Sequence, residues 1–300
     1  MLETPRVNVA VVQIAPRVGE YEANQAAVVE AVALAGADVV VVPELASSGY
    51  VFESVEEARA VARPADVALA PWISAAAAAG CVVAGGFAER DGDTLFNSGA
   101  LVDGNGVLAV YRKLHLWDRE QLFFTPGSDL PPVVDTAVGR LAMCICYDLE
   151  FPEVVRGLAL RGAELVCAPT NWPDEGRPDG ERPMEVVRAM AAASSNRVFI
   201  AASDRCGSER GVDWVGGSAI IAPSGFPLAG PGASGPAVLR ASVDLADARD
   251  KRISERNDVL ADRRVDMYGY RRPASGRPGR LRGVPGAAPR RPSGAGELRR

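Results

Sequence analysis

Histidine is nearly absent from this sequence, since His115 is the only one among 300 residues. A metal site built from several histidines is therefore excluded, and no two cysteines have the CxxC spacing of a thiolate zinc site. An odd number of cysteines, mostly within apolar runs, argues against a disulfide framework and favours free thiols in a reducing compartment. We expect neither a metal nor another cofactor. The five cysteines are Cys81, Cys144, Cys146, Cys167 and Cys206.

Long apolar runs are also missing. No segment approaches the roughly 18 to 20 apolar residues of a membrane-spanning helix, and the first residues lack the pattern of a secretory leader. The composition, 48% hydrophobic and 24% charged, is that of an ordinary globular protein. The sequence therefore predicts a cytoplasmic protein without a membrane partner.

Charge is distributed unevenly along the chain. Residues 271–300 contain nine Arg and one Glu, and they also hold five Pro and six Gly but few large apolar side chains. Such a segment cannot bury enough apolar surface to fold, so we predict a domain over 1–270 and a disordered tail over 271–300. The tail lacks the aromatic residues that often accompany basic ones in nucleic-acid binding, which makes a nucleic-acid partner the less favoured interpretation.

Strand and helix patterns alternate along the body of the chain, which favours an α/β fold with sheets covered on both faces. Apolar runs predict strands over 7–14, 38–42, 81–87, 95–102, 107–112, 139–146, 164–168, 197–203, 215–222, 226–229 and 236–243. Helical spacing predicts helices over 22–36, 66–79 with Asp66 as N-cap, 152–162, 182–195 and 245–252.

Cys146 stands where the strand 139–146 is predicted to end, shortly before a helix beginning at Pro152. A thiol at that edge of a sheet is near helix N-terminal amides, which lower the pKa of a thiol and suit a nucleophile. The alternative is a small core residue, as expected for Cys167. Cys144 lies deeper in the apolar run and is expected to be inert packing.

Two charged residues also follow strands. Glu44 comes after the apolar run 38–42, where burial would raise the pKa of its carboxyl and make it a proton acceptor; a turn residue is the alternative. Lys113, one of only two lysines, ends the strand 107–112, and a solvated lysine is the alternative there.

The segments VVVPE, YRKLHL and ICYDLEFPE occur in this order with Glu44, Lys113 and Cys146. From about residue 6 to 270 the chain resembles the nitrilase superfamily of carbon–nitrogen hydrolases. The resemblance implies a four-layer α-β-β-α sandwich. It also implies a catalytic triad in which Cys146 attacks an amide-type carbon, Glu44 transfers protons, and Lys113 with the backbone N–H of Tyr147 stabilises the oxyanion.

Further site residues follow from the same resemblance and from positions in the chain. Glu120 corresponds to a second glutamate that positions the lysine and the substrate, with a surface carboxylate as the alternative. Tyr50 follows the Glu44 loop, and Asn171 and Trp172 follow the strand 164–168, so from their place in the chain these three, together with Tyr147, are expected to line the substrate pocket. His115 is expected to be structural and not the base.

The dipeptide Tyr147-Asp148 after the cysteine is typical of amidases, whereas nitrile-hydrolysing relatives have Trp-Glu. The segments LHLWDREQLFFTPG and RNDVLADRR look most like bacterial aliphatic amidases. We therefore expect a small linear amide as substrate. An N-carbamoyl amine hydrolase, with Arg177 or Arg182 binding a substrate carboxylate, is the second interpretation, and a nitrilase or an acyltransferase is less favoured.

The resemblance also implies a homodimer or a larger homo-oligomer. A scaffold that binds nucleic acid through its basic tail is the competing class, but the presence of all three triad residues argues for retained chemistry.

Truncation after Tyr270 is expected to leave the melting temperature and the hydrolytic activity nearly unchanged, because the tail composition cannot contribute to a core. Differential scanning calorimetry and a turnover assay on the truncated and full chains check this. A large drop in melting temperature, or loss of a dimer, would show that the tail packs.

Overall fold

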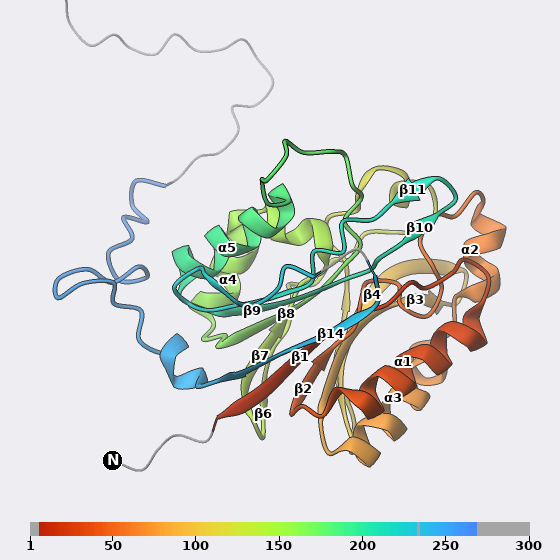
Figure 1. Cartoon of the computed structure of the whole chain (residues 1–300), viewed down its shortest axis with the longest axis horizontal. Coiled ribbons are helices and arrows are strands. Elements are labelled where there is room, and N and C mark those ends of the chain that lie inside the picture. Colours follow the sequence, from red (N-terminus) through yellow and green to blue (C-terminus); the bar gives the residue numbers. More distant parts are fainter. Residues whose placement is uncertain (1–5, 233–234, 269–300) are drawn as a thin grey trace, which may run out of the picture. The chain divides into compact units, whose positions relative to one another are not determined.

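The structure is a computed structural model that describes residues 6–232 and 235–268 (Figure 1). The described residues up to Asp262 form one compact unit, and Arg263 begins a second, of which only residues 263–268 are described. The predicted boundary at residue 270 and the predicted tail over 271–300 lie outside the described residues.

Two six-stranded sheets make up the centre of the first unit. The first sheet has the order β14 (Ala237–Val243), β1 (Val7–Gln13), β2 (Val39–Val41), β3 (Val82–Asp91), β4 (Thr94–Asp103) and β5 (Gly106–Arg112). The second has the order β13 (Pro227–Ala229), β12 (Ala219–Ile221), β9 (Phe199–Asp204), β8 (Leu165–Thr170), β7 (Gly139–Met143) and β6 (Val133–Thr136). In each sheet three neighbouring strands are parallel, β1-β2-β3 and β7-β8-β9, so helices must connect them.

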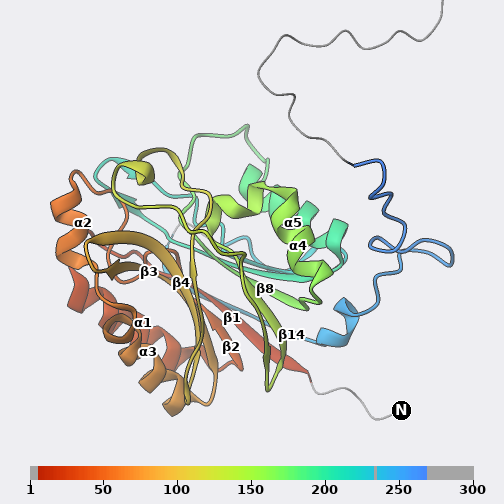
Figure 2. The same ribbon diagram turned by 180° about the vertical axis from the view of Figure 1, so that it is seen from behind.

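Those connecting helices form the outer layers (Figures 1 and 2). Helices α1 (Tyr21–Ala35) and α3 (Ala65–Ala79) pack on the first sheet, where Val32, Trp72 and Val40 share a buried core. Helices α4 (Pro152–Leu160) and α5 (Met184–Asn196) pack on the second sheet, whose core also includes the apolar residues between the sheets. The predicted α-β-β-α sandwich is confirmed.

Several boundaries differ from the sequence-based predictions. Helix α3 begins at Ala65 with Pro64 as N-cap, so Asp66 is not the cap. The predicted strand 139–146 ends at Met143, the predicted strand 215–222 is reduced to β12, and the predicted helix 245–252 is a 3-10 helix, η3 (Leu245–Ala248). Helix α2 (Val55–Val61) was not predicted, although Ser54 caps it by accepting a hydrogen bond from the backbone N–H of Glu57.

Two glycines lie where neighbouring parts of the chain approach closely, Gly99 between the two sheets and Gly86 within the first sheet. A Cβ atom on Gly99 of β4 would lie 2.5 Å from the sulfur of Met143 and 3.2 Å from Cδ1 of Ile145, in the second sheet and just beyond it. A Cβ atom on Gly86 of β3 would lie 2.6 Å from the Cα of Glu44. Both contacts are shorter than van der Waals distance, so only glycine fits there without displacing its neighbours.

Candidate active site

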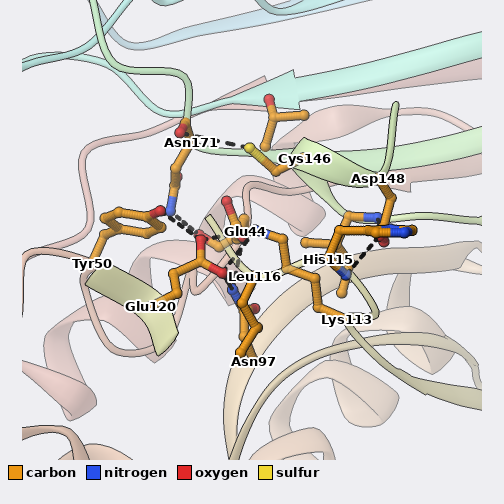
Figure 3. Close-up of polar contacts among 12 residues, drawn as sticks. Glu44, Tyr50, Asn97, Lys113, His115, Leu116, Glu120, Cys146, Asp148 and Asn171 are labelled. Carbon is orange, nitrogen blue, oxygen red and sulfur yellow. Dashed lines mark hydrogen bonds and ion pairs between the residues drawn. The ribbon is translucent and has the colours of Figure 1, made fainter. Parts of the chain in front are cut away.

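The carboxyl ends of strands from both sheets meet at one place. Glu44 follows β2 and Lys113 follows β5 of the first sheet, while Cys146 and Asn171 follow β7 and β8 of the second. Figure 3 shows these side chains turned toward one another. The sandwich therefore assembles one site from two separately hydrogen-bonded sheets, at the strand ends where ligands of α/β proteins usually bind.

Lys113 is held between two carboxylates. Its Nζ donates to Glu44 Oε1 at 2.6 Å and to Glu120 Oε1 at 2.8 Å. Lys113 and Glu44 are completely buried and Glu120 is 4% exposed, so none of the three is a solvated turn or surface residue. Burial disfavours the ammonium form, but the charges of Glu120 and Glu44 outweigh it and raise the pKa of Lys113. Lys113 is therefore a fixed positive charge.

Asn97 belongs to the same cluster and was missed from the sequence. It lies in the middle of β4, where its Nδ2 donates to Glu44 Oε1 at 2.7 Å. Asn97 is the only amide side chain in this strand, and this was the available signal, because a buried amide needs a partner. Asn97 and Lys113 together occupy Oε1 of Glu44.

The other oxygen of Glu44, Oε2, is buried and has no hydrogen-bond partner in the described part of the chain. Burial raises the pKa of Glu44 from 4.5 to about 7, against the lowering effect of Lys113. A carboxyl group with such a pKa can both accept and donate a proton near neutral pH, which general acid–base catalysis requires.

Cys146 begins a 3-10 helix, η2 (Cys146–Glu150), and has a φ of +44°, which is rare for a non-glycine residue. Its thiol donates to the backbone oxygen of Asn171 at 3.7 Å. The expected lowering of its pKa is wrong: burial and the Glu44 carboxylate raise the pKa well above the usual value, although Lys113 opposes them. The resting group is thus a neutral thiol that needs a base.

Cys144 and Cys146 do not share a strand, because β7 ends at Met143. Cys144 is completely buried in the hydrophobic core that includes residues of β7, β8 and α4, and burial raises the pKa of its thiol well above the usual value.

The remaining predicted residues surround the cluster. The hydroxyl of Tyr50 donates to Glu120 Oε1 at 2.5 Å, and Asn171 Nδ2 donates to the backbone oxygen of Glu44 at 2.9 Å. Burial and the nearby carboxylates raise the pKa of Tyr50, so its hydroxyl stays protonated and remains a donor. Tyr147 and Trp172 line a cavity beside the thiol.

This cavity, called the thiol-side cavity below, has a volume of about 610 Å³. Five carboxylates and three guanidinium groups border it, so its charge is on balance negative. The carboxylates belong to Glu150, Asp174, Glu175, Glu181 and Glu185, and the guanidinium groups to Arg177, Arg182 and Arg188.

Asp148 links the segment that carries Cys146 to the segment that follows Lys113. Its completely buried carboxylate accepts from the backbone N–H of Ile145 at 3.0 Å and from the hydroxyl of Tyr111 at 2.8 Å. It also accepts from the backbone N–H of His115 at 3.2 Å and lies 2.7 Å from His115 Nδ1. The His115 ring stacks on Phe151 with 3.7 Å between ring centroids, which agrees with its predicted structural place.

Replacing Asp148 by Asn is expected to lower kcat about 10- to 100-fold with little change in KM, because an amide places a donor among four donors and shifts the thiol relative to Lys113. Steady-state kinetics on a soluble variant check this. Asp135→Asn, at an exposed ion pair with Arg140, is the matched control and should leave kcat unchanged. An unchanged kcat in Asp148→Asn would contradict the positioning role.

Within residues 6–232 and 235–268, no group of three or more His, Cys, Asp or Glu side chains is arranged to hold a metal ion. In the same ranges, none of the helices has the length and apolar character needed to span a bilayer.

Residues 8–253 match the family model described as "Carbon-nitrogen hydrolase". The chain belongs to the carbon–nitrogen hydrolase family. It is consequently a hydrolase that acts on carbon–nitrogen bonds, and the predicted membership of the nitrilase superfamily is confirmed.

Curated relatives in this family carry different activities in their names. The chain is 36% identical over 267 residues to a protein of Pyrococcus abyssi named "Nitrilase", covering 87% of this chain and 99% of that protein. It is 33% identical to an "(R)-stereoselective amidase" of Pseudomonas sp., covering 88% and 93%. It is 31% identical to the "N-carbamoylputrescine amidase" of Solanum lycopersicum, covering 78% and 83%.

Among solved structures, the crystal structure of an amidase from Nesterenkonia sp. matches with a TM-score of 0.72 and 28% identity, covering 89% of this chain and 96% of that chain. This similarity extends over nearly the whole of that enzyme.

Proposed function

We propose that this hydrolase cleaves a small linear carboxamide to a carboxylate and ammonia through a thioester on Cys146. Glu44, Lys113 and Cys146 form the triad of the proposal, with Glu120 as the residue that positions the lysine and the substrate. The roles rest on the buried cluster in which these groups lie.

In the proposed reaction, Glu44 takes the proton of the Cys146 thiol as the sulfur attacks the carbonyl carbon. The oxyanion that forms is stabilised by Lys113 and by the backbone N–H of Tyr147. Glu44 then gives its proton to the amide nitrogen as the carbon–nitrogen bond breaks and ammonia leaves. Water, deprotonated by Glu44, hydrolyses the thioester and restores the thiol.

One observation carries the proposal. Glu44 has one oxygen held by Lys113 and Asn97, and its second oxygen is buried without a partner. A buried oxygen without a hydrogen-bond partner costs about 1–3 kcal/mol of folding stability. Such an oxygen is therefore expected where it exchanges protons with a ligand or a reacting group. A carboxyl with a pKa of about 7 beside a neutral thiol fits that exchange.

A solved relative supports a covalent adduct on cysteine. In a variant of the Nesterenkonia amidase, the acetamide moiety of fluoroacetamide is covalently added at the active-site cysteine. Other variants of that enzyme were solved with acrylamide and with butyramide. By similarity, we infer a small aliphatic amide for this chain.

Small aliphatic amides are expected to release ammonia faster than the corresponding nitriles. The reason for this expectation is the Tyr147-Asp148 pair after the cysteine. The test is needed because one relative is named "Nitrilase", which is consistent with faster nitrile turnover. Ammonia release from matched amides, nitriles and N-carbamoyl amines checks the order, with Cys146→Ala as the blank. Nitrile turnover equal to or faster than amide turnover would contradict the assignment.

An N-carbamoyl amine is the second candidate substrate. The excess of carboxylates around the thiol-side cavity favours a substrate whose far end is cationic over one that ends in a carboxylate. Arg177 is already paired with Asp174 at 3.5 Å, which weakens the earlier suggestion that it binds a substrate carboxylate. The same substrate panel separates the two candidates.

Assembly into a homodimer or larger homo-oligomer stays a prediction from the family resemblance, and a cytoplasmic location stays a prediction from the composition of the sequence. Light scattering after size exclusion measures the oligomeric state.

A further inference from the structure

A second cavity, called the glutamate-side cavity, lies next to the first. Its volume is about 220 Å³, and it shares Trp117, Pro173 and Glu175 with the thiol-side cavity. Its other lining residues are Tyr50, Val51, Phe52, Asp118, Arg119, Glu120, Phe123, Phe124, Val212 and Trp214.

The two cavities reach the reactive cluster from different sides. Cys146 lines the thiol-side cavity, whereas Glu120 and Tyr50 line the glutamate-side cavity. In Figure 3, Tyr50 and Glu120 are drawn to the left of Glu44, and Cys146 lies to its upper right. A scissile amide has the same two sides, since its acyl carbon bonds to the thiol while its nitrogen receives a proton from the carboxyl.

Aromatic residues are the largest group in the walls of the glutamate-side cavity, with six rings from Tyr50, Phe52, Trp117, Phe123, Phe124 and Trp214. Two rings already have a guanidinium group over them: Arg205 lies 4.5 Å from the Trp214 centroid and Arg119 lies 5.9 Å from that of Phe123. These faces are therefore less available to an ammonium group, which would otherwise suit an aromatic cage. Of the charged residues in its lining, Glu120 is buried and paired with Lys113, whereas Asp118, Arg119 and Glu175 are exposed. The buried part of the cavity therefore fits an uncharged apolar or aryl group better.

Trp214 adds a polar feature to these walls. Its indole N–H is buried and has no acceptor in the described part of the chain. Its ring is fixed by Tyr50, at 5.3 Å between centroids and 80° between planes. An unsatisfied donor in the wall of a cavity is expected where an occupant supplies the acceptor, and the π face of an aryl ring can accept from an N–H group.

From these observations we propose that the glutamate-side cavity binds the substituent on the amide nitrogen, so that the chain also hydrolyses secondary amides with an apolar or aryl N-substituent. This inference rests on the proposed function. The Cys146 sulfur bonds to the acyl carbon, the carbon–nitrogen bond breaks, and the amine leaves with the proton from Glu44. Water then converts the thioester to a carboxylic acid and the free thiol, so one amide and one water give one acid and one amine.

Matched acyl groups are assayed as the primary amide and as the N-benzyl amide, with ammonia and benzylamine measured separately. The wild-type chain is expected to release both. Val212→Trp fills the glutamate-side cavity, and it should lower kcat/KM for the N-benzyl amide at least about tenfold while changing that for the primary amide less than about twofold. Retained turnover of the primary amide shows that the variant is folded.

Val187→Trp, which fills the thiol-side cavity instead, is the matched control. It should lower kcat/KM for long acyl groups equally in both amide series. A wild-type chain that cleaves the primary but not the N-benzyl amide would overturn the inference, as would equal losses for both amides in Val212→Trp.

A second measurement needs no variant. Because a reaction and its reverse use the same site, benzylamine added during turnover of a primary amide should intercept the thioester and give the N-benzyl amide, detected by mass spectrometry. Methylamine at the same concentration of free base should give less N-methyl amide than benzylamine gives N-benzyl amide. Equal interception by both amines would contradict an aryl site.

The outcomes also separate the two proposals. Release of benzylamine from the N-benzyl amide, with no release of ammonia from the primary amide, would overturn the primary-amide assignment. It would support the glutamate-side cavity as the binding site of the N-substituent. A chain inactive toward both amides would overturn both.

Discussion

Cys146→Ala is expected to lose at least about a thousandfold in kcat while keeping its fold, because no other group in the cluster can form the thioester. In the wild type, intact-protein mass spectrometry after quenching with a slow amide should show an acyl adduct that maps to Cys146. Circular dichroism and the melting temperature verify that the variant is folded.

Cys144→Ala is the control for this result. Cys144 is completely buried in the core and has no place in the reactive cluster, so its loss should cost about 1 kcal/mol of stability and leave the chemistry intact. An adduct on Cys144, or full activity in Cys146→Ala, would show that the nucleophile has been assigned to the wrong thiol.

Glu44→Gln should have an effect of similar size, since an amide can neither take the thiol proton nor protonate the leaving nitrogen. The ionised carboxylate is the active base, and its pKa is about 7, so kcat/KM of the wild type should rise about tenfold per pH unit below pH 7 and level off above it. Lys113, whose pKa is raised, stays charged across that range. A pH–rate profile of the wild type measures this limb.

Glu185→Gln is the control for Glu44→Gln, because it removes a carboxylate from the thiol-side cavity and leaves the cluster around Lys113 intact. This variant should keep the wild-type turnover rate and the same rise of kcat/KM below pH 7. A wild-type profile that is flat between pH 5 and 8, or full turnover in Glu44→Gln, would falsify the proton-transfer role.

The sequence predicted the layers because each covered strand is a nearly continuous apolar run between turn residues, a local property. It was less informative where partners are distant in the chain. Asn97 became part of the site only when β4 was placed beside the end of β2, and a polar residue inside a strand does not name its partner. The extent of the short strand β12 likewise depends on tertiary pairing.

The pKa of the Cys146 thiol is a second property that the sequence alone could not predict. From sequence, the nearby helix start suggested a more acidic thiol, but the degree of burial of Cys146 and the position of Glu44 decide the direction, and both are set by the packing of two sheets. By contrast, a lysine at a strand end, one of only two lysines in an arginine-rich chain, was an informative local signal. Lys113 occupies a space between two carboxylates that suits a compact ammonium group.

The close approach at Gly86 and Gly99 bears on which positions this protein can change. Neither glycine has a reactive atom, yet a methyl group at Gly86 would displace the backbone of Glu44, and one at Gly99 would press on Ile145, the neighbour of Cys146. Mutational tolerance should accordingly be narrow at both positions, and narrowest at Gly86, where the neighbouring atoms belong to the backbone and not to side chains. A census of functional residues that counts only chemically active side chains would leave both glycines out.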